Sequence, residues 1–171
     1  MAEKIGYYST NRHLDNAPGI TPFRTVVSFR EALLMGQAPD EGLFMPAWIP
    51  QIPLEAFKAL KGAPYTEAAL LVTGAFLGEE FPAQTLRQIV ADAYNYPVPL
   101  ENVYARKYVL RLDQGPTASF KDFAARMMAR LMSASRDPGK RLNVLVATSG
   151  DTGSAVGDAF CGVEGIGVTI L

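Results

Sequence analysis

The feature that most constrains the fold is the alternation of apolar strands and helices in the C-terminal third of the chain. Residues 142–147, LNVLVA, and residues 166–171, IGVTIL, are short runs rich in β-branched side chains, typical of buried parallel strands. Between them, a tight loop at residues 148–154 leads into a predicted helix at residues 155–160. Strands that alternate with helices in this way predict an α/β fold built on a doubly wound parallel sheet.

The same alternation extends upstream to a predicted change of domain. Residues 103–112 are predicted to form a strand, and residues 120–135 are predicted to form a helix. The segment NYPVP at residues 95–99 breaks the preceding helical pattern. We therefore predict a helical module over residues 1–95, followed by the beginning of the α/β domain over residues 96–171.

The first module is expected to be small and mostly helical. Ser28 and Glu31 fit a capping box at the start of one helix. Residues 39–50 are rich in Pro and Gly and predict an ordered loop, whereas residues 65–77 are apolar and alanine-rich and predict a buried helix. Pro82 suits the first position of the next helix. One apolar stripe of that helix is formed by Leu86, Ile89, Val90 and Ala93.

Composition excludes several classes of function. The chain has 171 residues, with 16 lysines and arginines against 17 aspartates and glutamates, and this balance argues against nucleic acid or a membrane as partner. A single cysteine, Cys161, and a single histidine, His13, exclude an internal disulfide and argue against a zinc site. No stretch resembles a signal peptide or a membrane span, so we expect a cytoplasmic protein without a bound metal.

The strand at residues 166–171 is the last segment of the chain. A parallel sheet is usually covered on both faces and continues past two or three strands. We therefore expect a truncated piece of a longer enzyme. Its uncovered apolar faces and free sheet edge predict self-association, or partial disorder over residues 139–171.

One lysine stands out within GPTASFKDF, residues 115–123. Ser119 and Asp122 fit a second capping box, which places Lys121 in the first turn of a helix. A cation is electrostatically unfavourable there, and the flanking phenylalanine rings would remove water from the amine. A lysine amine of this kind can attack an aldehyde and form a Schiff base. The alternative is an ordinary solvated surface lysine.

The loop TSGDTGS at residues 148–154 is a candidate anion site. Exposed backbone N–H groups between a strand and a helix attract anions, and glycines let a ligand approach the backbone. The hydroxyls of Ser149, Thr152 and Ser154 add donors. The loop matches neither G-x-x-x-x-G-K-[ST] nor G-x-G-x-x-G. The alternative is a plain connection in which Asp151 or Thr152 caps the helix.

These segments carry a specific resemblance. GPTASFKDFAARMMARLM and LVATSGDTGSAV resemble the two hallmark segments of threonine synthases. YYSTN at residues 7–11 and VSFREALLMGQAPDEGLFMPAWIP at residues 27–50 resemble the start of the bacterial and fungal type of that family. Each central motif alone indicates a fold-type-II enzyme that depends on pyridoxal 5'-phosphate (PLP). The GLFMP segment favours threonine synthases over dehydratases and cysteine synthases.

The resemblance implies a reaction. Lys121 would bind PLP through a Schiff base and then shuttle protons at the α and β carbons of O-phospho-L-homoserine, with PLP as electron sink. Phosphate would leave from the γ carbon and water would add at the β carbon, giving L-threonine in the last step of its biosynthesis. The enzyme would be a carbon–oxygen lyase acting on phosphate. The substrate's anionic end would be held by Ser149, Gly150, Asp151 and Thr152.

The resemblance also places the loop that holds the PLP phosphate, and the partner of the pyridine nitrogen, beyond Leu171. The 171-residue chain alone is therefore expected to bind PLP weakly and to be inactive. Two other interpretations stay open. One is a different fold-type-II enzyme, such as a threonine or serine dehydratase or a phospho-lyase that stops before water addition. The other is a non-catalytic anion-binding or nucleotide-binding α/β domain in which Lys121 has no special role.

Overall fold

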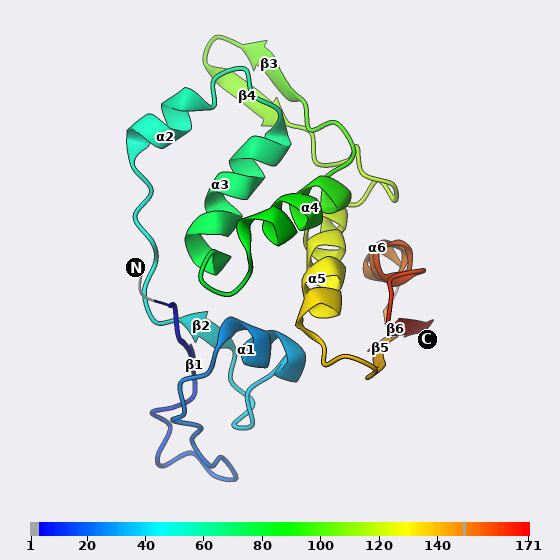
Figure 1. Ribbon diagram of the computed structural model, residues 1–171. Coiled ribbons are helices and arrows are strands. Elements are labelled where there is room, and N and C mark those ends of the chain that lie inside the picture. Colours follow the sequence, from blue (N-terminus) through cyan, green and yellow to red (C-terminus); the bar gives the residue numbers. More distant parts are fainter. Residues whose placement is uncertain (1–3, 149) are drawn as a thin grey trace. The chain divides into compact units, whose positions relative to one another are not determined.

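The computed structural model describes residues 4–148 and 150–171 and divides the chain into two compact units (Figure 1). The first unit comprises Met1–Gly62 and Ala68–Leu86, and the second comprises Ala63–Glu67 and Arg87–Leu171. This division falls within two helices, α3 (Tyr65–Leu77) and α4 (Ala83–Ala93). The domain boundary between residues 95 and 96 stays a prediction.

A short antiparallel pair of strands and a capped helix organise the first unit. Strand β1 (Tyr7–Ser9) pairs antiparallel with β2 (Phe44–Pro46). Helix α1 (Phe29–Met35) begins at the predicted capping box, which is confirmed. The Ser28 hydroxyl accepts a hydrogen bond from the Glu31 N–H at 3.3 Å, and the Glu31 carboxylate accepts one from the Ser28 N–H at 2.7 Å. Two otherwise unsatisfied donors at the helix start are thereby paired.

A buried carboxylate ties the β1 region to the turn before β2. Asp40 is only 2% exposed, and it accepts hydrogen bonds from the Ser9 hydroxyl at 2.5 Å, the Phe23 N–H at 2.8 Å and the Gly42 N–H at 3.1 Å. Burial alone would raise the pKa of Asp40, but these donors lower it below its ordinary value. The segments around Ser9, Phe23 and Gly42 are therefore held together by one ionised side chain.

The positions of the helices that follow agree with the prediction better than the burial of their side chains does. Helix α3 has the predicted bounds, but only Leu77 is buried, so the expectation of a buried helix is wrong. The predicted loop at residues 39–50 contains β2, and the six-residue helix α2 (Leu54–Ala59) has no counterpart in the prediction. In α4, which follows Pro82 directly, the predicted stripe is confirmed as buried: Leu86, Ile89, Val90 and Ala93.

The α/β layer of the second unit is close to the prediction. Helices α5 (Lys121–Ser135) and α6 (Asp151–Phe160) pack against each other, as Figure 1 shows, and strands β5 (Leu142–Val146) and β6 (Ile166–Ile170) are parallel and in register. The α5 helix and both strands are confirmed. Helix α6 begins four residues before the predicted position 155, so residues 151–154 of the expected loop are helical. The apolar core of the α/β layer comprises Ala125, Ala129, Ala155, Val156, Ala159, Phe160 and Ile166.

The single strand predicted at residues 103–112 is wrong. The chain instead forms an antiparallel hairpin of β3 (Leu100–Tyr104) and β4 (Lys107–Leu110), and every residue of both strands is exposed. The turn uses Ala105 in the left-handed region, at φ 49°. Alanine rarely adopts this conformation, so the sequence contains no ordinary turn signal at this point. Within the described ranges, no helix has the length and apolar character needed to cross a bilayer.

Candidate active site

Lys121 is the first residue of α5 and follows a tight turn. The Ala118 N–H donates to the Gly115 carbonyl at 3.1 Å, and Ala118 has φ 56°, in the left-handed region. A non-glycine residue in that conformation costs on the order of 1–3 kcal/mol and persists only where neighbouring contacts hold it. The chain therefore enters the lysine helix through a strained turn.

The capping box predicted from Ser119 and Asp122 is wrong in its pairing. The residue at the N-cap is Phe120, which makes no side-chain capping bond, and the Ser119 hydroxyl accepts from the Lys121 N–H at 3.3 Å. The Asp122 carboxylate accepts instead from the Thr117 hydroxyl at 2.6 Å and from the Thr117 N–H at 3.0 Å. A capping box uses the longer Glu or Gln at this position, and the shorter aspartate bonds to the turn instead.

The side chain of Lys121 is partly buried and lies beside one aromatic ring. Its Nζ is 4.5 Å from the ring centroid of Phe120, which is itself 62% exposed. Among the described residues, no carboxylate forms an ion pair with this amine, although Asp122 is its neighbour in the chain. The amine therefore combines a cation–π contact with freedom from a competing anion.

Phe123 does not share this role, contrary to the expectation that both rings surround the lysine. It lies in an aromatic cluster with Tyr65, Tyr94 and Tyr96, at centroid distances of 5.7, 5.8 and 5.3 Å. The Tyr94 hydroxyl donates to the Phe123 carbonyl at 3.3 Å. Burial, with a smaller contribution from Tyr65, raises the pKa of Tyr94 to about 12, and burial also raises the pKa of Tyr96. The cluster is therefore neutral at ordinary pH and packs against the first turn of α5.

The second candidate segment is the start of α6. Ser149 lies outside the described residues. Gly150 is the N-cap, at φ 145°, and makes no side-chain capping bond, so the alternative with Asp151 or Thr152 as N-cap is wrong. Gly153 is buried, and a Cβ there would lie 2.6 Å from a Thr148 methyl carbon. A glycine is therefore needed for close packing, whereas Gly150 and Asp151 are exposed.

The helices that begin at the two candidate segments pack against each other. Arg126 of α5 pairs with Asp158 of α6 at 3.2 Å, and further along, the Ser133 hydroxyl donates to the Glu164 carbonyl at 3.1 Å. Glu164 follows α6 in the chain, so these contacts join α5 to α6 and to the segment after it. The α6 N-terminus follows the end of β5, and ligands bind α/β sheets at this edge. Lys121 is the first residue of the helix that packs against α6.

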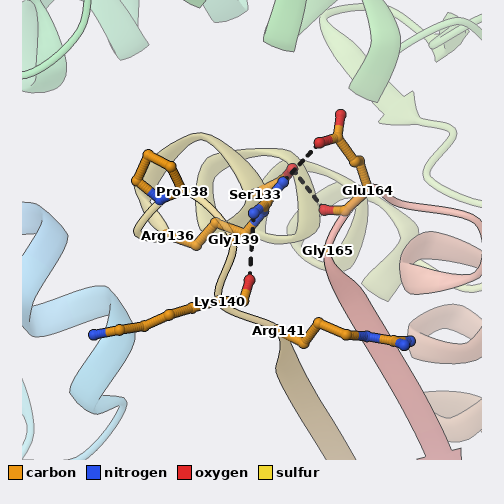
Figure 2. Close-up of a pocket in the computed structure, with 8 residues that line it drawn as sticks. All are labelled: Ser133, Arg136, Pro138, Gly139, Lys140, Arg141, Glu164 and Gly165. Carbon is orange, nitrogen blue, oxygen red and sulfur yellow. Dashed lines mark hydrogen bonds and ion pairs between the residues drawn. The ribbon is translucent and has the colours of Figure 1, made fainter.

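A hollow at the opposite end of α5 contains more cationic side chains, but its charges are largely paired. Figure 2 shows Arg136 between the Lys140 carbonyl and the Glu164 carboxylate, with hydrogen bonds of 3.3 and 2.8 Å. The Lys140 ammonium itself binds Asp137 at 2.6 Å. This hollow has no neutral nucleophile besides Ser133, whose hydroxyl is already bonded. We therefore place the candidate site at the α5 N-terminus.

The sequence interpretation missed the pairing of Thr117 with Asp122, since it paired Asp122 with Ser119 and did not single out Thr117. Thr117 and Asp122 form the bonds that join the turn to the helix, but they are five positions apart and meet only because Ala118 is left-handed. Neither a period of 3.6 nor a period of 2 predicts such a pair. Among residues 4–148 and 150–171, no group of three or more His, Cys, Asp or Glu side chains is placed to hold a metal ion.

Comparison with known proteins agrees with the resemblance noted in the sequence. The family model described as threonine synthase N terminus matches residues 19–94. Threonine synthase from Haemophilus influenzae is 44% identical over 145 residues, which cover 85% of this chain and 33% of the relative. Threonine synthase from Escherichia coli is 36% identical, with coverage of 85% and 34%.

A solved structure extends the match to 98% of the chain. PLP-bound threonine synthase from Brucella melitensis is similar with a TM-score of 0.84 and 38% identity, covering 98% of this chain and 35% of that one. The chain spans about a third of the length of the relatives that it matches. The predicted resemblance to the N-terminal portion of threonine synthases is thereby confirmed.

Proposed function

We propose that this chain is the N-terminal portion of a threonine synthase. The reaction would convert O-phospho-L-homoserine and water to L-threonine and phosphate, as a carbon–oxygen lyase acting on phosphate. The observation that carries this proposal is the placement of Lys121. Its amine has no ion-pair partner among the described residues, and it lies at the start of α5, the helix that packs against α6.

The residues present fit PLP. Lys121 Nζ would hold the cofactor by a covalent bond, since an unpaired and partly exposed amine can react with an aldehyde. When bound, PLP supplies an electron sink for carbanions. The exposed ring of Phe120 beside the amine would exclude water from that side of the cofactor.

The start of α6 would hold the substrate's anionic end. The first N–H groups of a helix have no intrahelical partner, and the helix dipole favours an anion there. The resemblance assigns this role to Ser149, Gly150, Asp151 and Thr152. The carboxylate of the exposed Asp151 would repel an anion. We therefore assign Asp151 a role through its backbone N–H, and Thr152 a role through both its N–H and its hydroxyl.

Lys121 would also handle protons. An amine fixed at a helix start can take a proton from the substrate's α carbon and return one nearby, because proton transfer needs a group held within hydrogen-bond reach. The rigid α5 start would keep Nζ within reach of the α and β carbons in turn. The rest of a fold-type-II domain would come from outside this chain, so we expect the 171-residue chain alone to be inactive. A cytoplasmic location and self-association stay predictions.

The test is a chimera in which this chain replaces the matching third of the Haemophilus influenzae threonine synthase. We expect phosphate release from O-phospho-L-homoserine with L-threonine as the product, and loss of both in the Lys121→Ala chimera. The unmodified relative and circular dichroism of each chimera control for assay and folding. A folded chimera that gives a 2-oxo acid would favour a dehydratase. One that gives neither product would contradict the proposal.

A further inference from the structure

We propose that Asp122 is a positioning residue for Lys121, fixing the place of Nζ without touching substrate or cofactor. The catalytic meaning of this inference rests on the proposed function. The structural content, a buried carboxylate that clamps the turn before α5, stands on the geometry alone.

Asp122 is fully buried, with 0% exposure, although it lies in the first turn of a helix. Both of its oxygens are used: Oδ1 accepts from the Thr117 hydroxyl at 2.6 Å and Oδ2 accepts from the Thr117 N–H at 3.0 Å. An ionised carboxylate is stable in the interior only when such donors satisfy it. The side chain therefore has a fixed partner and a fixed orientation.

Gly115 makes room for this arrangement. A Cβ at position 115 would lie 2.3 Å from Asp122 Oδ2 and 2.8 Å from Asp122 Cβ, so only glycine lets the turn approach the carboxylate so closely. Pro116, Ala118 and Phe120 in the same segment are exposed and contribute little burial. The bonds from Thr117 to Asp122, together with the bond from the Lys121 N–H to the Ser119 hydroxyl, hold the strained turn, with φ 56° at Ala118, against α5.

The clamp has a second consequence for the amine. A carboxylate next to Lys121 in the chain is a natural ion-pair partner, and an ion pair would hold the ammonium away from an incoming carbonyl. Because Thr117 occupies both oxygens of Asp122, the carboxylate is directed to the turn instead. One side chain thus orders the backbone under Lys121 and leaves Nζ unpaired among the described residues.

The experiment compares the 171-residue chain with Asp122→Ala, Thr117→Val and the conservative Thr117→Ser. Asp40→Asn serves as a matched control, since Asp40 is a buried carboxylate of the other unit with the same kinds of donor. The first readout is amide hydrogen exchange of residues 115–123. The second is the ratio of PLP labelling at Lys121 to that at Lys140 after borohydride reduction, mapped by peptide mass spectrometry. Acetic anhydride labelling, which needs no orientation, gives the reference reactivity of each amine.

In Asp122→Ala and Thr117→Val we expect exchange over residues 115–123 to rise about tenfold. The PLP labelling ratio should fall about tenfold or more, because misplacement by an ångström costs up to a hundredfold. The acetylation ratio should change less than about twofold. Thr117→Ser keeps the hydroxyl donor, so both readouts should stay at the values of the unmodified chain. Asp40→Asn should leave residues 115–123 and the labelling ratio unchanged.

Unchanged exchange over residues 115–123 in a folded Asp122→Ala chain would overturn the clamp. Raised exchange with an unchanged PLP ratio would overturn the positioning role. Failure of the proposed function gives a different result, because PLP would then label Lys121 of the unmodified chain no more than Lys140. Amide hydrogen exchange of residues 115–123 would still test the clamp. If Asp122→Ala does not fold, Thr117→Val, which keeps the backbone donor, provides the same test.

Discussion

Asp40 and Asp122 are buried by the same arrangement, one in each unit. Each accepts from a hydroxyl and from backbone N–H groups, and each lies against a glycine at which a Cβ would meet its oxygens, at 3.0 Å for Gly42 and 2.3 Å for Gly115. Asp40 joins loop segments that carry no reactive group, whereas Asp122 adjoins Lys121. A buried carboxylate is therefore no sign of catalysis by itself, and the group that it holds in place decides its role.

The largest effect should come from Lys121 itself. Lys121→Arg keeps the positive charge but removes the amine that reacts with an aldehyde. We expect the PLP adduct on this peptide to disappear and the activity of the chimera to fall by about 10²–10⁴-fold or more. Lys140→Arg is the control, since that side chain is exposed and paired with Asp137. If the Lys121→Arg and unmodified chains take up equal amounts of PLP, Lys121 is not the reactive lysine. Asp122 would then differ from Asp40 in no functional respect.

The two glycines test whether the arrangements are alike in packing. Gly42→Ala places a Cβ 2.1 Å from the Ser9 hydroxyl, and Gly115→Ala places one 2.3 Å from Asp122 Oδ2. Each should lower the free energy of unfolding by about 1–3 kcal/mol in urea titrations. Only Gly115→Ala should also lower the PLP labelling ratio at Lys121.

Gly74→Ala is the control for these glycines, because nothing lies within 4 Å of its Cβ position and it is in the interior of α3. It should stabilise the chain by up to about 1 kcal/mol. A loss of labelling in Gly42→Ala equal to that in Gly115→Ala would show that stability, and not the place of Lys121, controls the reaction.

The pH dependence of stability should reveal the Asp40 arrangement. Its folded pKa lies below the ordinary 3.8, so its contribution is fully present above that value and is lost as the pH falls through the folded pKa. The unmodified chain should be more stable than Asp40→Asn near neutral pH, and the difference should shrink in acid. Chemical unfolding between pH 7 and pH 2.5 measures this difference. A constant difference would mean that Asp40 gains nothing from its charge.

The smallest effect should come from an exposed carboxylate with similar bonds. Glu31 accepts from the Ser28 N–H and hydroxyl, both at 2.7 Å, and its pKa is lowered first by the backbone bond and then by the hydroxyl. Ser28→Ala should cost about 1 kcal/mol in thermal or urea unfolding. A cost above that of Gly42→Ala would show that burial does not distinguish Asp40 from this capping box.

The sequence predicts the regular elements of this fold better than the two segments that depend on a left-handed alanine. The α5 helix and strands β5 and β6 follow from their periodicity and β-branched composition. The β3–β4 hairpin and the Thr117–Asp122 pair both depend on an alanine with positive φ, at Ala105 and Ala118. Because alanine gives no signal for that conformation, neither could be predicted from residue type.

The candidate site divides in the same way. Lys121 was singled out by its neighbours and by the resemblance, and its place at the first turn of α5 agrees with the interpretation. The reason that its amine is unpaired was not predictable, since the sequence suggested that Asp122 would cap the helix with Ser119. The left-handed turn at Ala118, and not the spacing of a capping box, directs the carboxylate to Thr117.

The measurement that tests the central claim most directly is borohydride reduction of the chain after incubation with PLP, followed by peptide mass spectrometry. We predict a pyridoxyl adduct concentrated on Lys121, above the exposed Lys58 and Lys140, whose amines are paired with carboxylates. Adducts spread evenly over the exposed lysines, with none favoured at Lys121, would contradict the claim that the α5 N-terminus presents a distinct amine.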